Sequence, residues 1–329
     1  MEQLTLPLRS RRLLRVVLLS GGIASGLVAI EVARRFGTDD LVLLNHDIHP
    51  LVEAADVKRF KDDIAAHLCV PITYANHDRW DAVTQFDVVR EARAFKVGTG
   101  SELCTARLKT EPFRRWREAH TRPGEAVFYY GFDAGERKRI TRRTTILGAE
   151  GYATDYPLAL WVPRTIVDPR EVGIEPPNTY SVFKHGNCCG CLKAGKQHWY
   201  VVFCTRPDIW QLGKDAEEDI GYTIHDGASL EELEPLFVAM RDAGIPATEH
   251  IQSQTFWADV RRRVRLPVVG PAPALDLQAE ANAKPCECVF RKRRHREIPP
   301  PCDCGIGDHV RGGHRLFCNR VLGRSPEAA

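Results

Sequence analysis

The chain has 329 residues, of which 43% are hydrophobic and 27% charged, and its formal net charge is +3. This composition is typical of a globular protein with a main domain of about 200 residues and a smaller appendage. The apolar runs are strand-sized, which excludes a helix of about 20 apolar residues that crosses a membrane, and the small net charge excludes a dedicated nucleic-acid binder whose whole surface attracts polyanions.

The cysteine content indicates a reducing compartment. The chain holds 11 cysteines, and the basic segment at residues 9–15 leads into a short apolar run and then a glycine loop instead of a signal-peptide cleavage site. We therefore expect metal, cluster or redox chemistry in the cytoplasm, in place of a disulfide framework. A membrane partner is not expected.

The first motif is a glycine loop at residues 20–25, with the sequence Ser-Gly-Gly-Ile-Ala-Ser. A mostly apolar run at residues 13–19 precedes it, and a helical pattern at residues 26–36 follows. Glycines let the backbone turn sharply, and the N-terminus of the following helix directs N–H groups at an anion. The pattern therefore predicts a phosphate-binding loop, against the alternative of an ordinary turn between strand and helix. It matches neither the Walker loop nor the GxGxxG motif.

The elements that follow alternate between strand and helix patterns. In chain order these are a strand at 41–44, a helix at 51–68, a strand at 70–74, a helix at 101–119 and a strand at 126–132. This alternation predicts an α/β fold with a doubly wound, mainly parallel sheet and helices on both faces. Ligands of such sheets bind outside the carboxyl ends of the strands, where the strand order reverses.

Three polar segments are expected at that edge of the sheet. They are residues 20–25, 45–47 and 131–136, so motifs far apart in the chain converge on one nucleotide in this interpretation. Gly131 and Asp47 are candidate nucleotide-binding residues. For Asp47 the alternative of a helix cap for the segment after Pro50 stays open.

We predict four consecutive parts. They are a nucleotide-binding domain at residues 1–215, a helical extension at 216–265 that includes an amphipathic helix at 229–243, an alanine- and proline-rich linker at 266–285, and a small basic, cysteine-rich appendage at 286–329. Within the first part, residues 163–177 are rich in proline and charge and are expected to form an irregular excursion.

Two distant segments carry thiols that suit a soft metal. Cys188 and Cys191 have the CxxC spacing that lets one tight turn present two sulfurs to the same ion. Cys104 is the candidate third ligand and Cys189 a candidate fourth. The sequence therefore predicts an iron–sulfur cluster or a zinc ion held by Cys104, Cys188 and Cys191.

The appendage carries a second cysteine pattern, with CxC pairs formed by Cys286, Cys288, Cys302 and Cys304. Two such pairs can close a tetrahedral zinc site and supply folding energy to a segment too short for a core; free thiols in a flexible tail are the alternative. Basic runs at residues 137–143 and 291–296 could meet nucleic-acid phosphates, against the commoner alternative of solvated charge.

Taken in order, these motifs resemble those of the phosphoadenosine phosphosulfate (PAPS) reductase family of the PP-loop superfamily. The matching segments are SGGxxS at 20–25, Cys-Thr-x-x-x-Lys at 104–109, Gly-Phe at 131–132 with Glu136 and Arg139, Tyr-Pro-Leu at 156–158, and Asn-Cys-Cys-Gly-Cys at 187–191. The resemblance implies an adenine nucleotide alpha-hydrolase-like fold that binds ATP or PAPS.

The resemblance also implies residue roles. Phosphate would be held by Ser20, Gly21, Gly22 and Ser25. Arg139 would neutralise it, with Arg142 and Lys109 as second choices, and Glu136 would orient Arg139 or a metal such as Mg²⁺. In the reaction expected below, the attacking sulfur is carried on the cluster or on a thiolate such as Cys189. The alternative for the charged residues is a surface ion pair without a chemical role.

Three departures from the family pattern shape the functional hypothesis. Ile23-Ala24 stands where many ATP-cleaving members carry Lys-Asp, the C-terminal Glu-Cys-Gly-Leu-His segment of true PAPS reductases is missing, and position 104 has a single cysteine where the cluster-binding members have a pair. We therefore expect adenylation or sulfur transfer on a nucleic-acid or small acceptor, with a sulfur-donor protein as partner. The alternatives are reduction of PAPS or adenylylsulfate with an external thiol, and a non-catalytic nucleotide- or nucleic-acid-binding module.

Overall fold

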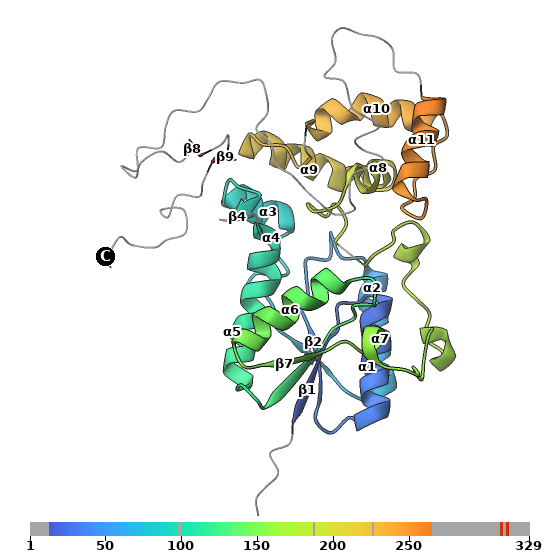
Figure 1. Cartoon of the computed structure of the whole chain (residues 1–329). Helices are drawn as coiled ribbons and strands as arrows, with labels where there is room; N and C mark the ends of the chain where they lie inside the picture. Colours follow the sequence, from blue (N-terminus) through green and yellow to red (C-terminus); the bar gives the residue numbers. More distant parts are fainter. Residues whose placement is uncertain are drawn as a thin grey trace, which may run out of the picture. The chain divides into compact units, whose positions relative to one another are not determined.

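The computed structural model describes residues 13–97, 101–186, 188–225 and 227–264, and two short paired strands, β8 (Val310–Arg311) and β9 (His314–Arg315) (Figure 1). The chain divides into two compact units. Unit 1 comprises Met1–Asp47, Ala55–Asn76 and Pro112–Asn178, and unit 2 comprises Ile48–Ala54, His77–Glu111 and Thr179–Ala329. The boundaries expected after residues 215, 265 and 285 stay predictions.

Unit 1 is built on a five-stranded sheet in which every pair of neighbours is parallel. The strands are β1 (Leu14–Leu18), β2 (Leu41–Asn45), β3 (Ile72–Tyr74), β6 (Ala126–Tyr129) and β7 (Ala153–Asp155). The predicted α/β fold with a parallel sheet is confirmed. The edge strand β7 was not predicted, because its three residues include only one apolar side chain, the exposed Ala153.

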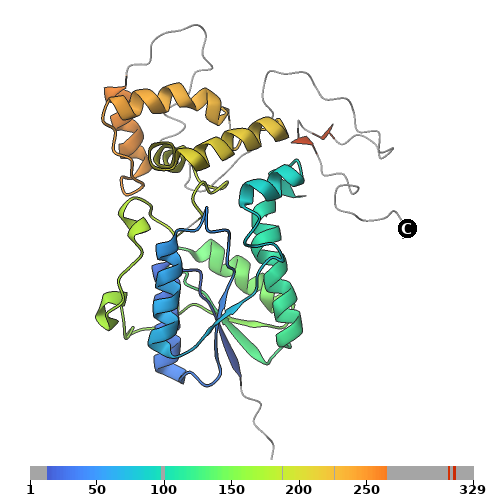
Figure 2. The same cartoon turned by 180° about the vertical axis from the view of Figure 1, so that it is seen from behind.

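Helices cover both faces of this sheet, as Figures 1 and 2 show from opposite sides. They are α1 (Ile23–Phe36) and α2 (Ala55–Leu68) on one face, and α5 (Glu111–His120) and α6 (Arg137–Ala149) on the other. Because side chains alternate along a strand, Val17 belongs to the hydrophobic cluster that contains Phe60 of α2, whereas its neighbour Val16 belongs to the cluster that contains Phe113 and Trp116 of α5.

The strand order is β3-β2-β1-β6-β7. From β1 the chain proceeds through β2 to β3 at one edge, and from β6 it proceeds to β7 at the other. The order therefore reverses between β1 and β6, and in open α/β sheets the crevice outside the carboxyl ends of two such strands is the usual ligand site. The short helix α7 (Pro157–Leu160) follows β7, and the expected irregular segment contains only the 3-10 turn η2 (Pro169–Val172).

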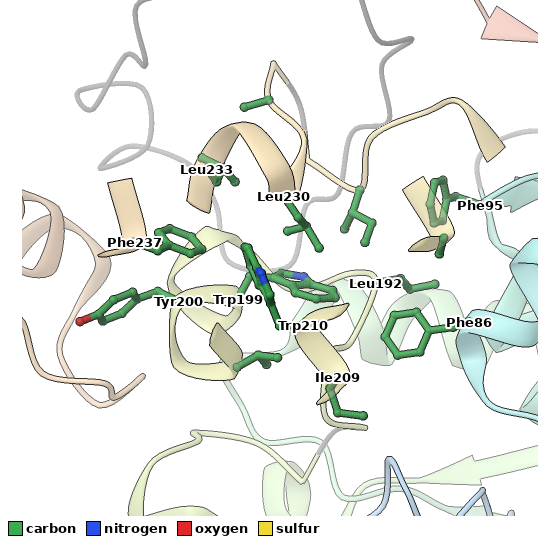
Figure 3. Packing of buried hydrophobic residues seen from close by; sticks show 14 of the residues in the cluster. Phe86, Phe95, Leu192, Trp199, Tyr200, Ile209, Trp210, Leu230, Leu233 and Phe237 are labelled. Atoms are coloured by element: carbon green, nitrogen blue, oxygen red, sulfur yellow. The ribbon is translucent and has the colours of Figure 1, made fainter. Parts of the chain in front are cut away.

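Unit 2 is mainly helical. Its elements are α3 (Gln85–Glu91), the two-residue strands β4 (Lys96–Val97) and β5 (Ser101–Glu102), α4 (Leu103–Thr105), the π-helical turn η1 (Ala106–Thr110), the 3-10 turn η3 (Asn178–Ser181), which begins at the last residue of unit 1, α8 (Lys196–Thr205), α9 (Pro207–Ile220), α10 (Leu230–Asp242) and α11 (Ser253–Arg263). Its core gathers large aromatic side chains, among them Trp199, Tyr200, Trp210 and Phe237 (Figure 3).

The helix predicted at residues 101–119 corresponds to the run of α4, η1 and α5. It differs from the prediction by the π-helical turn in its middle, where the hydrogen-bond pattern widens. Among the described residues, no helix combines the length and the apolar character that a membrane span requires.

Candidate functional site

In unit 1 the glycine loop connects the end of β1 to the start of α1. Gly21 has φ +79°, a left-handed conformation that favours glycine, and a Cβ placed there would lie 2.5 Å from Cγ1 of Val57. Gly22 is the N-cap of α1, and the first turn of that helix contains no acidic side chain. An anion at this helix end would therefore meet backbone N–H groups and a favourable dipole.

The side chain of Ser25 forms hydrogen bonds with other residues of the loop. Its Oγ donates to the carbonyl oxygen of Gly22 at 2.8 Å and accepts the backbone N–H of Ser20 at 3.1 Å. The Ser20 hydroxyl also donates to this Oγ, at 3.2 Å. Because the Ser25 side chain is almost fully buried, the first and last residues of the motif hold the turn in one shape before any ligand binds.

Gly131, which follows β6, lies directly against this loop. A Cβ at Gly131 would lie 3.0 Å from the backbone carbon of Ala24 and 3.0 Å from the backbone nitrogen of Ser25. The structure thus brings together two predicted segments that are more than 100 residues apart in the chain. Both follow strands that flank the reversal of strand order, the position expected for a ligand crevice.

Behind the loop lies a polar network that the sequence analysis missed in part. The ammonium of Lys61, a side chain only 1% exposed, donates to Oδ1 of Asn45 at 3.1 Å and lies 3.4 Å from Oδ1 of Asp47. Asn45 in turn donates to the carbonyl oxygen of Leu19 at 2.5 Å. Asp47 also pairs with Lys58, so Asp47 lies in this network. Lys61 gives no local sequence signal, because one lysine within an amphipathic helix pattern is normally exposed.

The predicted charged residues of α6 lie further along unit 1. Glu136 forms an ion pair with Arg139, as one of its two predicted roles requires, and Glu136 also accepts the backbone N–H of Asp133 at 3.1 Å. The guanidinium of Arg139 lies 4.2 Å from the ring centroid of Phe132, and 64% of this side chain is exposed. Arg142 is exposed.

Unit 2 brings the predicted thiols into one neighbourhood. The pKa of Lys109, in the π-helical turn, is raised chiefly by the charge of Cys188, and also by Cys191, Cys104 and Glu53, while burial acts in the opposite direction. These influences indicate that three thiols and a carboxylate lie within electrostatic range of the ammonium. The π-helical turn that contains Lys109 begins two residues after Cys104, and such turns occur frequently at functional sites.

Burial favours the neutral form of Cys104, Cys189 and Cys191. Burial raises the pKa of Cys104 to about 11 and that of Cys191 to about 12, and Lys109 lowers both in part. Burial also raises the pKa of Cys189 to about 11, with Arg206 acting in the opposite direction. Because the thiolate is the reactive form, Cys189 would have to lose its proton before it could act as the predicted nucleophile.

The turn that carries these cysteines is anchored by its backbone. The N–H of Cys189 donates to the carbonyl oxygen of Val52 at 2.8 Å, and Nε2 of Gln85 donates to the carbonyl oxygen of Cys189 at 2.8 Å. Gly190 has φ +67°, and a Cβ there would lie 2.5 Å from Cγ2 of Ile209. The turn is therefore packed against the aromatic core and requires glycine at its centre.

A buried histidine supports the same turn, and sequence reasoning did not find it. The backbone N–H of Cys191 donates to Nε2 of His198 at 3.3 Å, and Nδ1 of that ring lies 2.7 Å from Oε1 of Glu249. The pair His198–Glu249 is separated by 51 residues. The only local signal is a histidine at the start of an otherwise apolar helix, which is more often a core residue than a functional one.

The donor set of the three thiols suits a soft metal, but their arrangement does not form a ligand group. Among the described residues, no group of three or more histidine, cysteine, aspartate or glutamate side chains is placed to hold a metal ion. The thiols lie within electrostatic range of the Lys109 ammonium. The metal at Cys104, Cys188 and Cys191 therefore stays a prediction, and no chemical step is derived through it. Asn187 and the predicted zinc ligands Cys286, Cys288, Cys302 and Cys304 lie outside the described residues.

Comparisons of the chain with protein-family models, with curated proteins and with solved structures find no match. The geometry of the two sites therefore carries the functional argument.

Proposed function

We propose that this protein is a PP-loop enzyme of the PAPS reductase-like kind that binds the phosphates of an adenine nucleotide at residues 20–25. The observation that supports this most is the position of the glycine loop. It follows β1 exactly where the strand order reverses, and Gly131 from the neighbouring strand lies within van der Waals contact of it. A loop of this composition at this place in an open parallel sheet is a suitable anion cradle.

A lysine outside the loop lies close to it, although the loop itself lacks the lysine that many family members carry there. The loop has Ile23-Ala24 and therefore no lysine of its own. The Lys61 side chain passes 3.3 Å from the position that a Cβ of Gly21 would take, and its ammonium joins Asn45 and Asp47. We propose that Lys61 is a positioning residue, because it packs beneath the loop and holds polar side chains at the end of β2.

The proposed reaction is adenylation followed by sulfur transfer. An acceptor oxygen attacks the α-phosphorus of ATP, the bond from that phosphorus to the oxygen bridging to the β-phosphate breaks, and pyrophosphate leaves. A sulfur nucleophile then attacks the acceptor carbon and AMP leaves with the carbon–oxygen bond electrons. The loop N–H groups would stabilise charge on the phosphates during the first step. A sulfide delivered by an external sulfur donor would be this nucleophile, because attack by the thiolate of Cys189 itself would leave the acceptor joined to the protein as a thioether.

The first test measures ATP binding and pyrophosphate release in wild-type protein and in two glycine variants. Gly21→Ala places a methyl group against Val57 at a positive φ, so we expect nucleotide binding to be lost. Gly37→Ala is the matched control, since Gly37 also has φ +79° but an added Cβ there meets nothing within 4 Å. Ser25→Ala, which removes the hydroxyl that closes the loop, provides a milder second variant.

Product identity separates the chemical alternatives. Release of pyrophosphate from ATP supports adenylation. Release of sulfite from PAPS in the presence of an added thiol would instead show that the reaction is reduction. Binding of nucleotide without either product would support a non-catalytic module. If Gly21→Ala and Gly37→Ala bind ATP as wild type does, the loop is not the nucleotide site and the proposal is wrong.

A further inference from the structure

The helix α6 carries an unusual distribution of charge. Arg137, Lys138, Arg139, Arg142 and Arg143 all lie in it, and no acidic residue does. Only Arg139 has a carboxylate partner, Glu136, among the residues that the structure describes. Arg143 is half-buried with its guanidinium 5.3 Å from the ring centroid of Tyr130. Three exposed cations remain without an ion pair within the described part of the chain, namely Arg137, Lys138 and Arg142.

This arrangement opposes the electrostatics of the helix itself. The positive end of a helix dipole is at the N-terminus, where carboxylates are favourable and cations are not. The first turn of α6 contains no acidic residue, and the last turn contains no basic residue. The cations therefore repel both one another and the helix end in the free protein, and a bound polyanion would relieve that repulsion.

The basic surface is held rigidly on the sheet. The rings of Tyr130, Phe132 and Tyr156 stack at centroid separations of 5.4 to 6.0 Å. The hydroxyl of Tyr156 donates to the carbonyl oxygen of Ile140 at 3.2 Å and lies 2.8 Å from Oγ1 of Thr144. These contacts fix the basic half of α6, so its charges are pre-organised and binding need not order the helix first.

We propose that Arg137, Lys138 and Arg142, the α6 basic surface, form a docking site for the phosphate backbone of a polynucleotide. The three residues span about 7.5 Å of helix axis at 1.5 Å per residue. Each strand of a duplex carries a phosphate about every 3.4 Å of its axis, so the three cations match two or three successive phosphates. Thr141 and Thr145 are exposed on the same helix, and their hydroxyls would supply further donors to phosphate oxygens.

An anionic membrane would require a different helix. A helix that lies in a membrane surface buries an apolar face beneath its cations. In α6 the residue that is fully buried is Leu147, which packs in the core of unit 1, and Ile146 is the large apolar side chain exposed on this helix. The exposed face is otherwise cationic and hydroxylated, which favours a phosphate backbone over lipid tails.

The test measures binding of fluorescently labelled duplex DNA and RNA of mixed sequence to the full chain, without ATP, over a range of salt concentrations. Arg137→Gln with Lys138→Gln should reduce the slope of log K against log[salt] by about 2, since each phosphate neutralised contributes about 0.9. Arg79→Gln with Arg241→Gln is the matched control. It removes the same charge from two exposed arginines that are paired with Glu91 and Asp242, and its slope should equal that of wild type.

Each result decides the proposal. A slope change confined to the α6 variant supports it, and Arg142→Gln alone should then reduce the slope by about 1. Equal slopes in all variants, absence of binding by wild type, or stronger binding to phosphatidylserine vesicles than to either polynucleotide would overturn it. The cysteine-rich tail is present in every protein compared, so its own contribution cancels. Gly21→Ala should bind polynucleotide as wild type does, which separates this proposal from that for the nucleotide loop.

Discussion

Oε1 of Glu249 lies 2.7 Å from Nδ1 of His198, and both side chains are largely removed from solvent. A carboxylate at this position keeps the proton on Nδ1, so Nε2 is free to accept the N–H of Cys191. The hydrogen bond from His198, second to a larger and opposing burial effect, lowers the pKa of Glu249 below its usual value. The dyad therefore holds one end of the cysteine turn through the tautomer that it selects.

Glu249→Gln should loosen that turn. An amide can donate to Nδ1 and so allow the other tautomer, which presents an N–H to the N–H of Cys191. We expect Cys191 to become more reactive towards iodoacetamide and the folded state to lose about 1 to 3 kcal/mol, as for a buried hydrogen bond that is left unmade. Mass spectrometry of alkylated peptides reads the first effect and denaturant unfolding the second. Glu234→Gln, which breaks the exposed pair with Lys214, is the control, and equal results in both variants would contradict the role of the dyad.

His225 should make the protein sensitive to mild acid. Its pKa is lowered from 6.5 to about 3, first by burial and then by the charges of Lys196 and His198, and none of the described residues forms a hydrogen bond with its Nε2. The unfolded chain therefore binds a proton that the folded chain does not, so stability is complete above pH 6.5 and falls as the pH drops from 6.5 towards 3. Each pH unit in that window costs about 1.4 kcal/mol from this group.

The variant His225→Leu should lose this part of the pH dependence. Denaturant unfolding followed by tryptophan fluorescence at pH 7 and pH 5 measures it, because Trp199 lies next to the histidine ring in the core of unit 2. The exposed His67 offers a matched control in His67→Leu, which should behave as wild type. If wild type and His225→Leu lose the same free energy between the two pH values, His225 is not buried in its neutral form.

The sequence predicted those parts of the fold that depend on residues close together in the chain. Apolar runs and helical periodicity located four of the five strands of the sheet, and the glycine loop was found because strand, glycines and helix are contiguous. The neighbourhood of Gly131 followed from the rule that parallel strands end at one edge. These predictions needed no knowledge of which distant side chains meet.

The parts that sequence missed depend on tertiary contact. Lys61 can be buried because oxygens of Asn45 and Asp47, at the end of β2, are its hydrogen-bond and ion-pair partners. The sequence of α2 alone gives no sign of these partners. His198 and Glu249 meet across 51 residues. The helical state of residues 137–149 was also missed, because a run of cations is an unusual start for a helix and its apolar contact is confined to the far end.

Lys109 should control the reactivity of the thiols around it. Its positive charge lowers the pKa of Cys104 and of Cys191, against the larger opposite effect of burial. Lys109→Met should therefore raise both pKa values and slow alkylation at a fixed, mildly alkaline pH, in protein freed of metal with a chelator. The exposed Cys69 serves as an internal reference whose rate should not change. Unchanged or faster alkylation of Cys104 and Cys191 would contradict the placement of the ammonium among the thiols.

The predicted metal provides the last test of the thiol cluster. Three soft donors in one neighbourhood suit iron or zinc, although the lysine ammonium lies within electrostatic range of them. We expect protein purified without oxygen to carry iron or zinc, and Cys188→Ser with Cys191→Ser to lose it. Cys69→Ser with Cys204→Ser is the matched control and should keep it. A third variant, Cys286→Ser with Cys302→Ser, measures how much of the metal is bound by the predicted tail site, and that amount is subtracted from the total. Equal metal content in the first two variants would show that Cys188 and Cys191 bind no metal.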